Sequence, residues 1–262
     1  MLKLEVSGGI GSIRIARPEV HNAFNGELVT GIMDAVEAMT ENSEVRVILL
    51  CSEGRSFCAG ADLGWMKGMV TASREDNETG ALRMGGLFRA LNSCPKPVVA
   101  RVQGAAIGGG LGLVSCADIV VASTRAKFGL SEVRLGLAPA VISPFVVSKI
   151  GESQARRYFL TGERFSAADA LSLGLVHEVV EEEELDTAVE EIIASLLKGG
   201  PGAQEACKAL AREGRMQMTS AALDEDNAKV IAALRVSPEG QEGLAAFFEG
   251  RAPGWVPEEG SK

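Results

Sequence analysis

The sequence contains few of the residues from which metal sites and disulfide frameworks are built. Of its 262 residues, 2 are histidine and 5 are cysteine, and the cysteines do not stand at the spacings of metal ligands. An odd number of cysteines also does not favour a paired disulfide scaffold. We therefore expect neither a bound metal nor structural disulfides.

Long apolar runs and clusters of basic residues are also missing. The longest uncharged stretch lies around residues 103–117, which is shorter than the roughly 18 to 20 apolar residues of a membrane span, and the N-terminus lacks the apolar segment of a secretion signal. The formal net charge of −9, with no basic cluster, argues against binding to nucleic acid. We expect a cytoplasmic protein that acts on a small molecule, without a membrane or nucleic-acid partner.

The remaining pattern predicts an α/β fold. Residues 2–15 alternate apolar and polar side chains around Gly8 and Gly9, which is typical of a β-hairpin. Apolar residues at helical spacing follow Asn25, a candidate N-cap, and the run 45–51 predicts a buried strand. Residues after 185 predict helices broken at 198–202, so we expect a core over 1–198 and a C-terminal helical region over 199–262.

Two glycine-rich and alanine-rich turns each follow a predicted strand and lead into a predicted helix. The first is FCAGADL (57–63), and the second is AIGGGLGL (106–113). The second turn fits neither the dinucleotide-binding glycine pattern nor the G-K-[ST] phosphate loop. Glycines at such a place can allow close helix packing, or two such turns can direct two backbone N–H groups at one carbonyl oxygen. The repetition of the turn favours the second interpretation.

Three segments in this order and spacing, FCAGADL, VQGAAIGGGLGL with CADIVVA, and FGLSEVRLGL (128–137), resemble the signature segments of the crotonase, or enoyl-CoA hydratase/isomerase, superfamily. The resemblance covers nearly the whole chain. It implies a spiral of repeated ββα units with a C-terminal helical region, homotrimers or homohexamers, and acyl-CoA thioester substrates with no separate cofactor. Other segments look like the bacterial methylglutaconyl-CoA hydratases of leucine breakdown and the related isohexenylglutaconyl-CoA hydratases.

The resemblance also assigns roles to individual residues. It implies that the N–H groups of Ala61 and Gly109 form an oxyanion hole, that Glu132 is a catalytic acid and base, and that residues of both turns line the substrate site: Ala59, Gly60, Ala61, Asp62, Leu63, Gly64, Gly108, Gly109 and Gly112. Gly112 stands where the hydratases carry a second catalytic glutamate. We expect water or the acyl chain to fill the space of that missing side chain.

Several alternatives stay open at this stage. The chain is predicted to be an enoyl-CoA hydratase, but a single glutamate also suits a Δ3,Δ2-enoyl-CoA isomerase, and a silent acyl-CoA-binding subunit would keep only the oxyanion hole. Asp62 is also a candidate helix cap. Arg134, or failing it Lys67, is a candidate for binding a carboxylate at the far end of the acyl chain.

Overall fold

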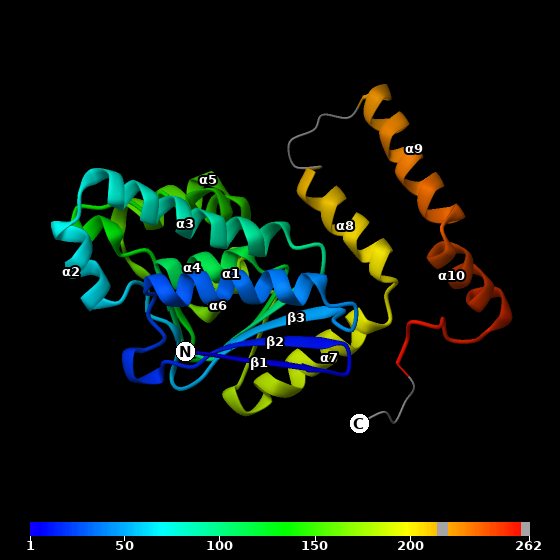
Figure 1. The fold of residues 1–262 in the computed structure, drawn as a ribbon, viewed down its shortest axis with the longest axis horizontal. Helices are drawn as coiled ribbons and strands as arrows, with labels where there is room; N and C mark the ends of the chain where they lie inside the picture. Colours follow the sequence, from blue (N-terminus) through cyan, green and yellow to red (C-terminus); the bar gives the residue numbers. More distant parts are fainter. Residues whose placement is uncertain (214–219, 258–262) are drawn as a thin grey trace.

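The computed structural model describes residues 1–213 and 220–257 of the chain (Figure 1). It begins with the predicted hairpin, β1 (Leu2–Ser7) and β2 (Ile10–Ile15), which pair antiparallel across Gly8 and Gly9. Both glycines have positive φ angles, 56° and 82°, which glycine adopts without the penalty that other residues meet. The turn chemistry alone was therefore sufficient to predict this element.

The strands form two sheets, and from β3 to β8 the chain alternates between them. The larger has the order β1-β2-β3-β5-β7-β10 and the smaller the order β4-β6-β8-β9. Apart from the antiparallel pairs β1 with β2 and β8 with β9, neighbouring strands are parallel. The remaining strands are β3 (Val47–Ser52), β4 (Ser56–Cys58), β5 (Val98–Val102), β6 (Ala105–Ile107), β7 (Ile119–Ser123), β8 (Lys127–Gly129), β9 (Arg164–Ser166) and β10 (Glu178–Val180). The expected spiral is confirmed, because β3 with β4, β5 with β6 and β7 with β8 repeat one plan.

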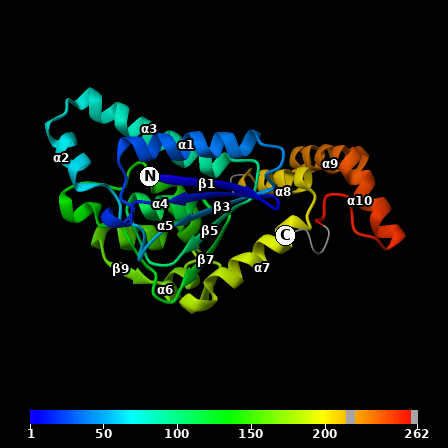
Figure 2. The same ribbon diagram turned by 60° about the horizontal axis from the view of Figure 1, so that its bottom comes forward.

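Helices cover both faces of the larger sheet (Figures 1 and 2). On one face, α1 (Gly26–Glu41), α3 (Arg74–Ser93), α4 (Gly109–Cys116) and α5 (Ser143–Thr161) enclose the main core. On the other face, α7 (Leu185–Leu197) packs on the side chains of Val47, Val99 and Val121. These alternate along their strands with the side chains that face the main core. The central strands are buried on both faces, which explains their continuous apolar sequence.

Capping residues define where several helices begin. The Asn25 side chain accepts a hydrogen bond from the Leu28 N–H at 2.8 Å, which confirms it as the N-cap of α1. Ser73 caps α3 in the same way, so the polar segment near it is a helix start. From about residue 130 to 180 the sequence pattern indicates helical and loop segments, so the short helix α6 (Ala167–Ser172) agrees with it, whereas the strands β9 and β10 were not predicted.

The C-terminal helices α8 (Pro201–Glu213), α9 (Ala221–Val236) and α10 (Pro238–Glu249) follow the predicted break at Lys198–Gly202. α8 lies against the body of the molecule, where Lys208 Nζ donates to Asp118 Oδ2 at 2.6 Å, whereas α9 and α10 project from it (Figure 1). Within the described residues, no helix is both long and apolar enough to cross a membrane.

The two strand-to-helix turns touch through their backbones. A Cβ atom added to Gly110 on α4 would lie 2.3 Å from the Cys58 carbonyl oxygen and 2.9 Å from the Cys58 Cβ. Such distances are far below van der Waals contact, and a backbone carbonyl in a sheet has little room to move. Close packing, one of the two explanations for the glycine run, is therefore the role of Gly110.

We expect Gly110→Ala to lower the free energy of unfolding by about 1 to 3 kcal/mol, because the new methyl group must push the two turns apart. Gly80→Ala on α3 is the matched control, since no heavy atom lies within 4 Å of its added Cβ. This control should raise the stability by up to about 1 kcal/mol, the helix propensity difference. Urea denaturation of both variants measures the effect, and equal stabilities would contradict the packing argument.

Candidate active site

The first turn joins β4 to α2 (Leu63–Thr71) and presents the N–H of Ala61. Gly60 has a φ of 95°, and its added Cβ would lie 3.2 Å from the Ile107 carbonyl oxygen, so this position needs glycine. Ala61 forms a β-bridge with Phe24. The hydrogen bonds of that bridge use the Gly60 carbonyl and the Asp62 N–H, so pairing with Phe24 does not engage the Ala61 N–H.

Asp62 caps α2, as its position before the helix suggested. Its Oδ1 accepts hydrogen bonds from the N–H groups of Gly64 at 2.8 Å and Trp65 at 3.3 Å. These two bonds, with a smaller contribution from the Arg17 guanidinium, lower the pKa of the Asp62 carboxyl. Asp62 is thus ionised at neutral pH and is suited to positioning rather than to proton transfer.

The second turn joins β6 to α4 and presents the N–H of Gly109. Gly108 has φ 53° and ψ −119°, and its own N–H is paired with the Gly129 carbonyl at 2.9 Å. Gly109 is the first residue of α4, where backbone N–H groups have no partner within the helix. The ring of Phe24 packs against this turn, since a Cβ on Gly109 would lie 2.8 Å from Phe24 Cε2. One residue therefore contacts both turns.

Glu132 stands at the second turn, on the 3-10 helix Glu132–Leu135. A Cβ on Gly108 would lie 3.0 Å from Glu132 Oε1, so the glycine leaves room for the carboxyl. Glu132 Oε2 is buried and has no hydrogen-bond partner among the described residues. Burial raises the pKa of this carboxyl, because desolvation penalises its charged form. A carboxyl with a raised pKa at this turn is suited to proton transfer.

The expectation of open space at Gly112 is wrong. Side chains occupy that place, since an added Cβ would lie 2.5 Å from Ile142 Cγ2 and 2.9 Å from Phe88 Cε1. Gly112 is itself buried in α4. An apolar wall of buried core side chains, Phe88 of α3 and Ile142 of the segment before α5, therefore fills the position where the resemblance places a second carboxylate.

The remaining predicted residues lie at the surface of the turns. Ala59, Leu63, Gly64 and Lys67 are exposed. Arg134 packs beside Gly162, and its Nε would lie 3.1 Å from a Cβ added there. The hydrogen bond from Arg157 lowers the pKa of Glu163, with a smaller contribution from the charge of Arg134. Successive residues of a 3-10 helix are about 120° apart, so Arg134 and Glu132 point in different directions. The structure does not bring the Arg134 side chain to the Glu132 carboxyl.

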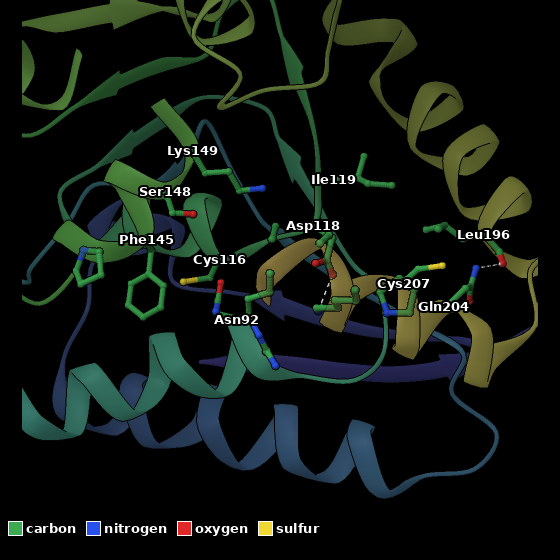
Figure 3. Close-up of a pocket in the computed structure, with 16 residues that line it drawn as sticks. Asn92, Cys116, Asp118, Ile119, Phe145, Ser148, Lys149, Leu196, Gln204 and Cys207 are labelled. Carbon is green, nitrogen blue, oxygen red and sulfur yellow. Dashed lines mark hydrogen bonds and ion pairs between the residues drawn. The ribbon is translucent and has the colours of Figure 1, made fainter. Parts of the chain in front are cut away.

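A cavity of about 790 Å³ lies elsewhere (Figure 3). Cys116 at the C-terminal end of α4 lines it, together with Lys149 of α5 and the Asp118–Lys208 ion pair, whereas the two strand-to-helix turns adjoin the N-terminal end of α4. Asp118 Oδ2 also accepts from the Val98 N–H at 2.8 Å, so this carboxylate joins α8 to the strand β5. None of Ala61, Gly109 and Glu132 lines this cavity. Within the described residues, no group of three or more acidic, histidine or cysteine side chains could hold a metal.

Sequence reasoning missed the segment that holds the first turn. Arg17 forms an ion pair with Asp62, and the fully buried Asn22 donates to the carbonyls of Glu53 and Ser56. The signal available was the group of polar residues in RPEVHNAFN, just after the hairpin. Its partners are more than thirty positions away, so the pattern alone does not identify them.

Comparison with known proteins confirms the resemblance drawn from the motifs. Residues 5–258 match the family described as Enoyl-CoA hydratase/isomerase. The crystal structure of an enoyl-CoA hydratase from Shewanella pealeana superimposes with a TM-score of 0.94 at 40% identity, over 97% of this chain and 95% of that one. The crotonyl-CoA hydratase of Syntrophomonas wolfei is 32% identical over 97% of this chain and 96% of its own. The trans-2-decenoyl-[acyl-carrier-protein] isomerase of Streptococcus mutans is 29% identical over 95% of both chains.

We expect Glu132→Gln to stabilise the folded protein increasingly as the pH rises. The folded-state pKa of Glu132 is above the ordinary value for glutamate, so any stability that the acid form provides is lost as the pH rises through the folded-state pKa. Glutamine carries no charge to desolvate. Thermal midpoints between about pH 5 and pH 8 measure the difference, with Glu5→Gln on the exposed strand β1 as control. A difference from wild type that does not change with pH would contradict the raised pKa.

Proposed function

Because the chain belongs to the enoyl-CoA hydratase/isomerase family, we propose that it adds water across the α,β double bond of an enoyl-CoA thioester, or catalyses the reverse reaction. The observation that carries this proposal is the Glu132 carboxyl, whose Oε2 is buried and unpaired among the described residues, at a turn where the Gly109 N–H has no partner within its helix. Ala61 and Gly109 would donate hydrogen bonds to the thioester oxygen. Negative charge develops on that oxygen when a nucleophile attacks the β-carbon, and fixed donors stabilise it.

Glu132 would carry both proton transfers. As a carboxylate it takes a proton from water while the water oxygen bonds to the β-carbon and the electron pair of the double bond moves toward the thioester oxygen. The protonated Glu132 then returns the proton to the α-carbon, the carbonyl reforms, and the carboxylate is regenerated. The two steps add one water molecule and change no oxidation state, so they require neither a metal nor a further cofactor.

Isomerisation is the second candidate, and the apolar wall at Gly112 favours it. A Δ3,Δ2-enoyl-CoA isomerase moves one proton between carbons and needs no group to hold water. Ile142 and Phe88 fill the place where such a second group would stand. The isomerase from Streptococcus mutans among the relatives is consistent with this chemistry within the family.

For the acyl group we propose a branched diacid, the methylglutaconyl group. This rests on the similarity of the segments GADLGWM and LSEVRLGLAPAV to the methylglutaconyl-CoA hydratases, and on cations near both turns. Lys67 on the exposed helix α2 is better placed than Arg134 to meet a second carboxylate, since Arg134 lies beside Gly162.

We also propose that the chain assembles into homotrimers or pairs of trimers through its C-terminal helices. α9 and α10 project from the body and expose large apolar side chains, among them Val236 at 77%, Phe247 at 77% and Phe248 at 80%. Large apolar side chains that are exposed together mark protein–protein contacts, and the rings of Phe247 and Phe248 lie 5.6 Å apart on α10.

The purified protein should consume the absorbance of crotonyl-CoA, because hydration destroys the conjugated enoyl thioester. An isomerase would instead create this absorbance from a 3-enoyl-CoA, and a silent binding subunit would do neither. Glu132→Gln should keep substrate binding and lose about two to four orders of magnitude in kcat, the usual contribution of a positioned acid or base.

The control for this variant is Glu152→Gln on α5, whose side chain is 78% exposed and which should retain full turnover. Isothermal titration with a substrate analogue checks that binding persists in Glu132→Gln. Turnover near the wild-type value in this variant would remove Glu132 from the proposed mechanism.

Replacing the cation that binds a distal carboxylate should impair methylglutaconyl-CoA more than crotonyl-CoA. For Lys67→Met we expect kcat/KM to fall about 10-fold or more on the diacid, the value of a charge-assisted hydrogen bond, and to change little on crotonyl-CoA. Arg134→Met is the comparison variant, in which we expect a smaller selective loss. Equal effects on both substrates in both variants would refute the diacid proposal.

A further inference from the structure

The guanidinium of Arg17 contacts both segments that pair in the β-bridge between Phe24 and Ala61. Its Nη1 donates to the Ala23 carbonyl at 2.5 Å, and its Nη2 donates to Asp62 Oδ2 at 3.1 Å. Ala23 directly precedes Phe24, and Asp62 directly follows Ala61, the two residues of the bridge. The Arg17 guanidinium therefore links the segment before Phe24 to the turn that carries the Ala61 N–H.

The contact is shielded from solvent. The Arg17 and Asp62 side chains are 13% and 20% exposed, so water screens their ion pair less than one at the surface. The geometry also depends on the fork of the guanidinium, because two of its nitrogens each bind an acceptor on a different segment of the chain. A lysine ammonium, a point charge on a flexible stem, does not reproduce this arrangement.

Arg17 is itself held in place through Asn22. The Arg17 N–H donates to Asn22 Oδ1 at 2.8 Å, and the Asn22 amide donates to the carbonyls of Glu53 and Ser56, both at 2.8 Å. Asn22 is completely buried and has a φ of 57°, a conformation that asparagine tolerates better than most residues. The segment that carries Arg17 is thus anchored to the loop between β3 and β4 before it reaches the turn.

The same segment sets the distance between the two donors. The Phe24 backbone pairs on either side of Ala61, while its ring packs against Gly109. Any shift of the Ala61 turn relative to Phe24 would therefore change how the two N–H groups converge. We propose that Arg17, acting through Asp62 and Ala23, is a positioning residue for the oxyanion hole. The proposal rests on the proposed function, because it requires Ala61 and Gly109 to act on a thioester oxygen.

Kinetics and a chromophoric ligand test this role. Arg17→Gln should lower kcat on crotonyl-CoA about 10- to 100-fold and change KM less than about threefold, because a small misplacement of a catalytic donor slows the reaction more than it weakens binding. The CoA thioester of 4-dimethylaminocinnamic acid should absorb at longer wavelength when bound to wild type, since donors to the carbonyl polarise it. Arg17→Gln should lose most of this shift.

A double-mutant cycle distinguishes positioning from general stability. Asp62→Asn keeps an oxygen that can cap α2 and removes the charged partner of Arg17. If the two residues act as a pair, Asp62→Asn should also lower kcat, and the double variant should be no slower than Arg17→Gln alone. Arg17→Lys should fall between wild type and Arg17→Gln. The control is Arg74→Gln, whose side chain is 93% exposed on α3 and which should behave as wild type.

The outcomes separate this inference from the proposed function. If wild type neither turns over crotonyl-CoA nor shifts the chromophore, the proposed function fails. If wild type does both and Arg17→Gln keeps kcat within about twofold together with the full shift, only the positioning role is refuted. Additive losses of kcat in Arg17→Gln and Asp62→Asn would likewise overturn the pairing.

Discussion

The structure depends on the approach of two backbone turns to each other, with the Cys58 carbonyl lying where a side chain on Gly110 would begin. The turns leave β4 and β6, which are parallel neighbours in the smaller sheet, so both emerge at the same edge. Because glycine removes the Cβ, α4 begins next to the Ala61 turn rather than a side-chain width away from it. The two candidate donors, Ala61 and Gly109, are neighbours for this reason, and the spiral supplies the parallel strands that make the arrangement possible.

The glycines that allow this close approach also lower the stability of the local structure at the site. The sequence of α4, GGLGLVSC, is a poor helix former, and the Glu132 carboxyl has one buried oxygen, Oε2, without a hydrogen-bond partner in the described part of the chain. The surrounding core offsets both deficits. Phe24 and Phe88 are completely buried against these turns with their rings 6.5 Å apart at a steep angle, a favourable aromatic arrangement. Packing from Phe24, α3 and α5 thus holds a segment that its own sequence would not keep helical.

Features decided by nearby residues were predictable from the sequence, and features decided by distant ones were not. Asn25 and Asp62 cap helices that begin directly after them, and Gly8 with Gly9 makes a hairpin turn, so both patterns are local. β9 and β10 are three residues long and form on strands about forty and sixty positions earlier. Arg17 meets Asp62 across 45 positions, and the side chains that fill the space at Gly112 come from α3 and from the segment before α5. The motifs indicated the turns and Glu132, whereas the apolar wall at Gly112 and the contact of Arg17 with Asp62 could be found only from the folded structure.

The apolar wall at Gly112 means that, under the proposed function, Glu132 must carry out both proton transfers. With two carboxylates, one can hold the water while the other exchanges the proton with carbon. Here Ile142 and Phe88 stand in the second place, so under the proposed roles a single carboxyl must give back to the α-carbon the proton it took from water. That task favours a carboxyl whose pKa is raised toward neutrality, because the acid and base forms are then both accessible within one turnover. Partial burial of Glu132 raises its pKa, because desolvation penalises the charged form, and this shift is in the direction that a single carboxyl with both roles requires. The same reasoning explains why hydration and isomerisation stand close together in this geometry, since both need one group that alternates between acid and base beside a stabilised enolate.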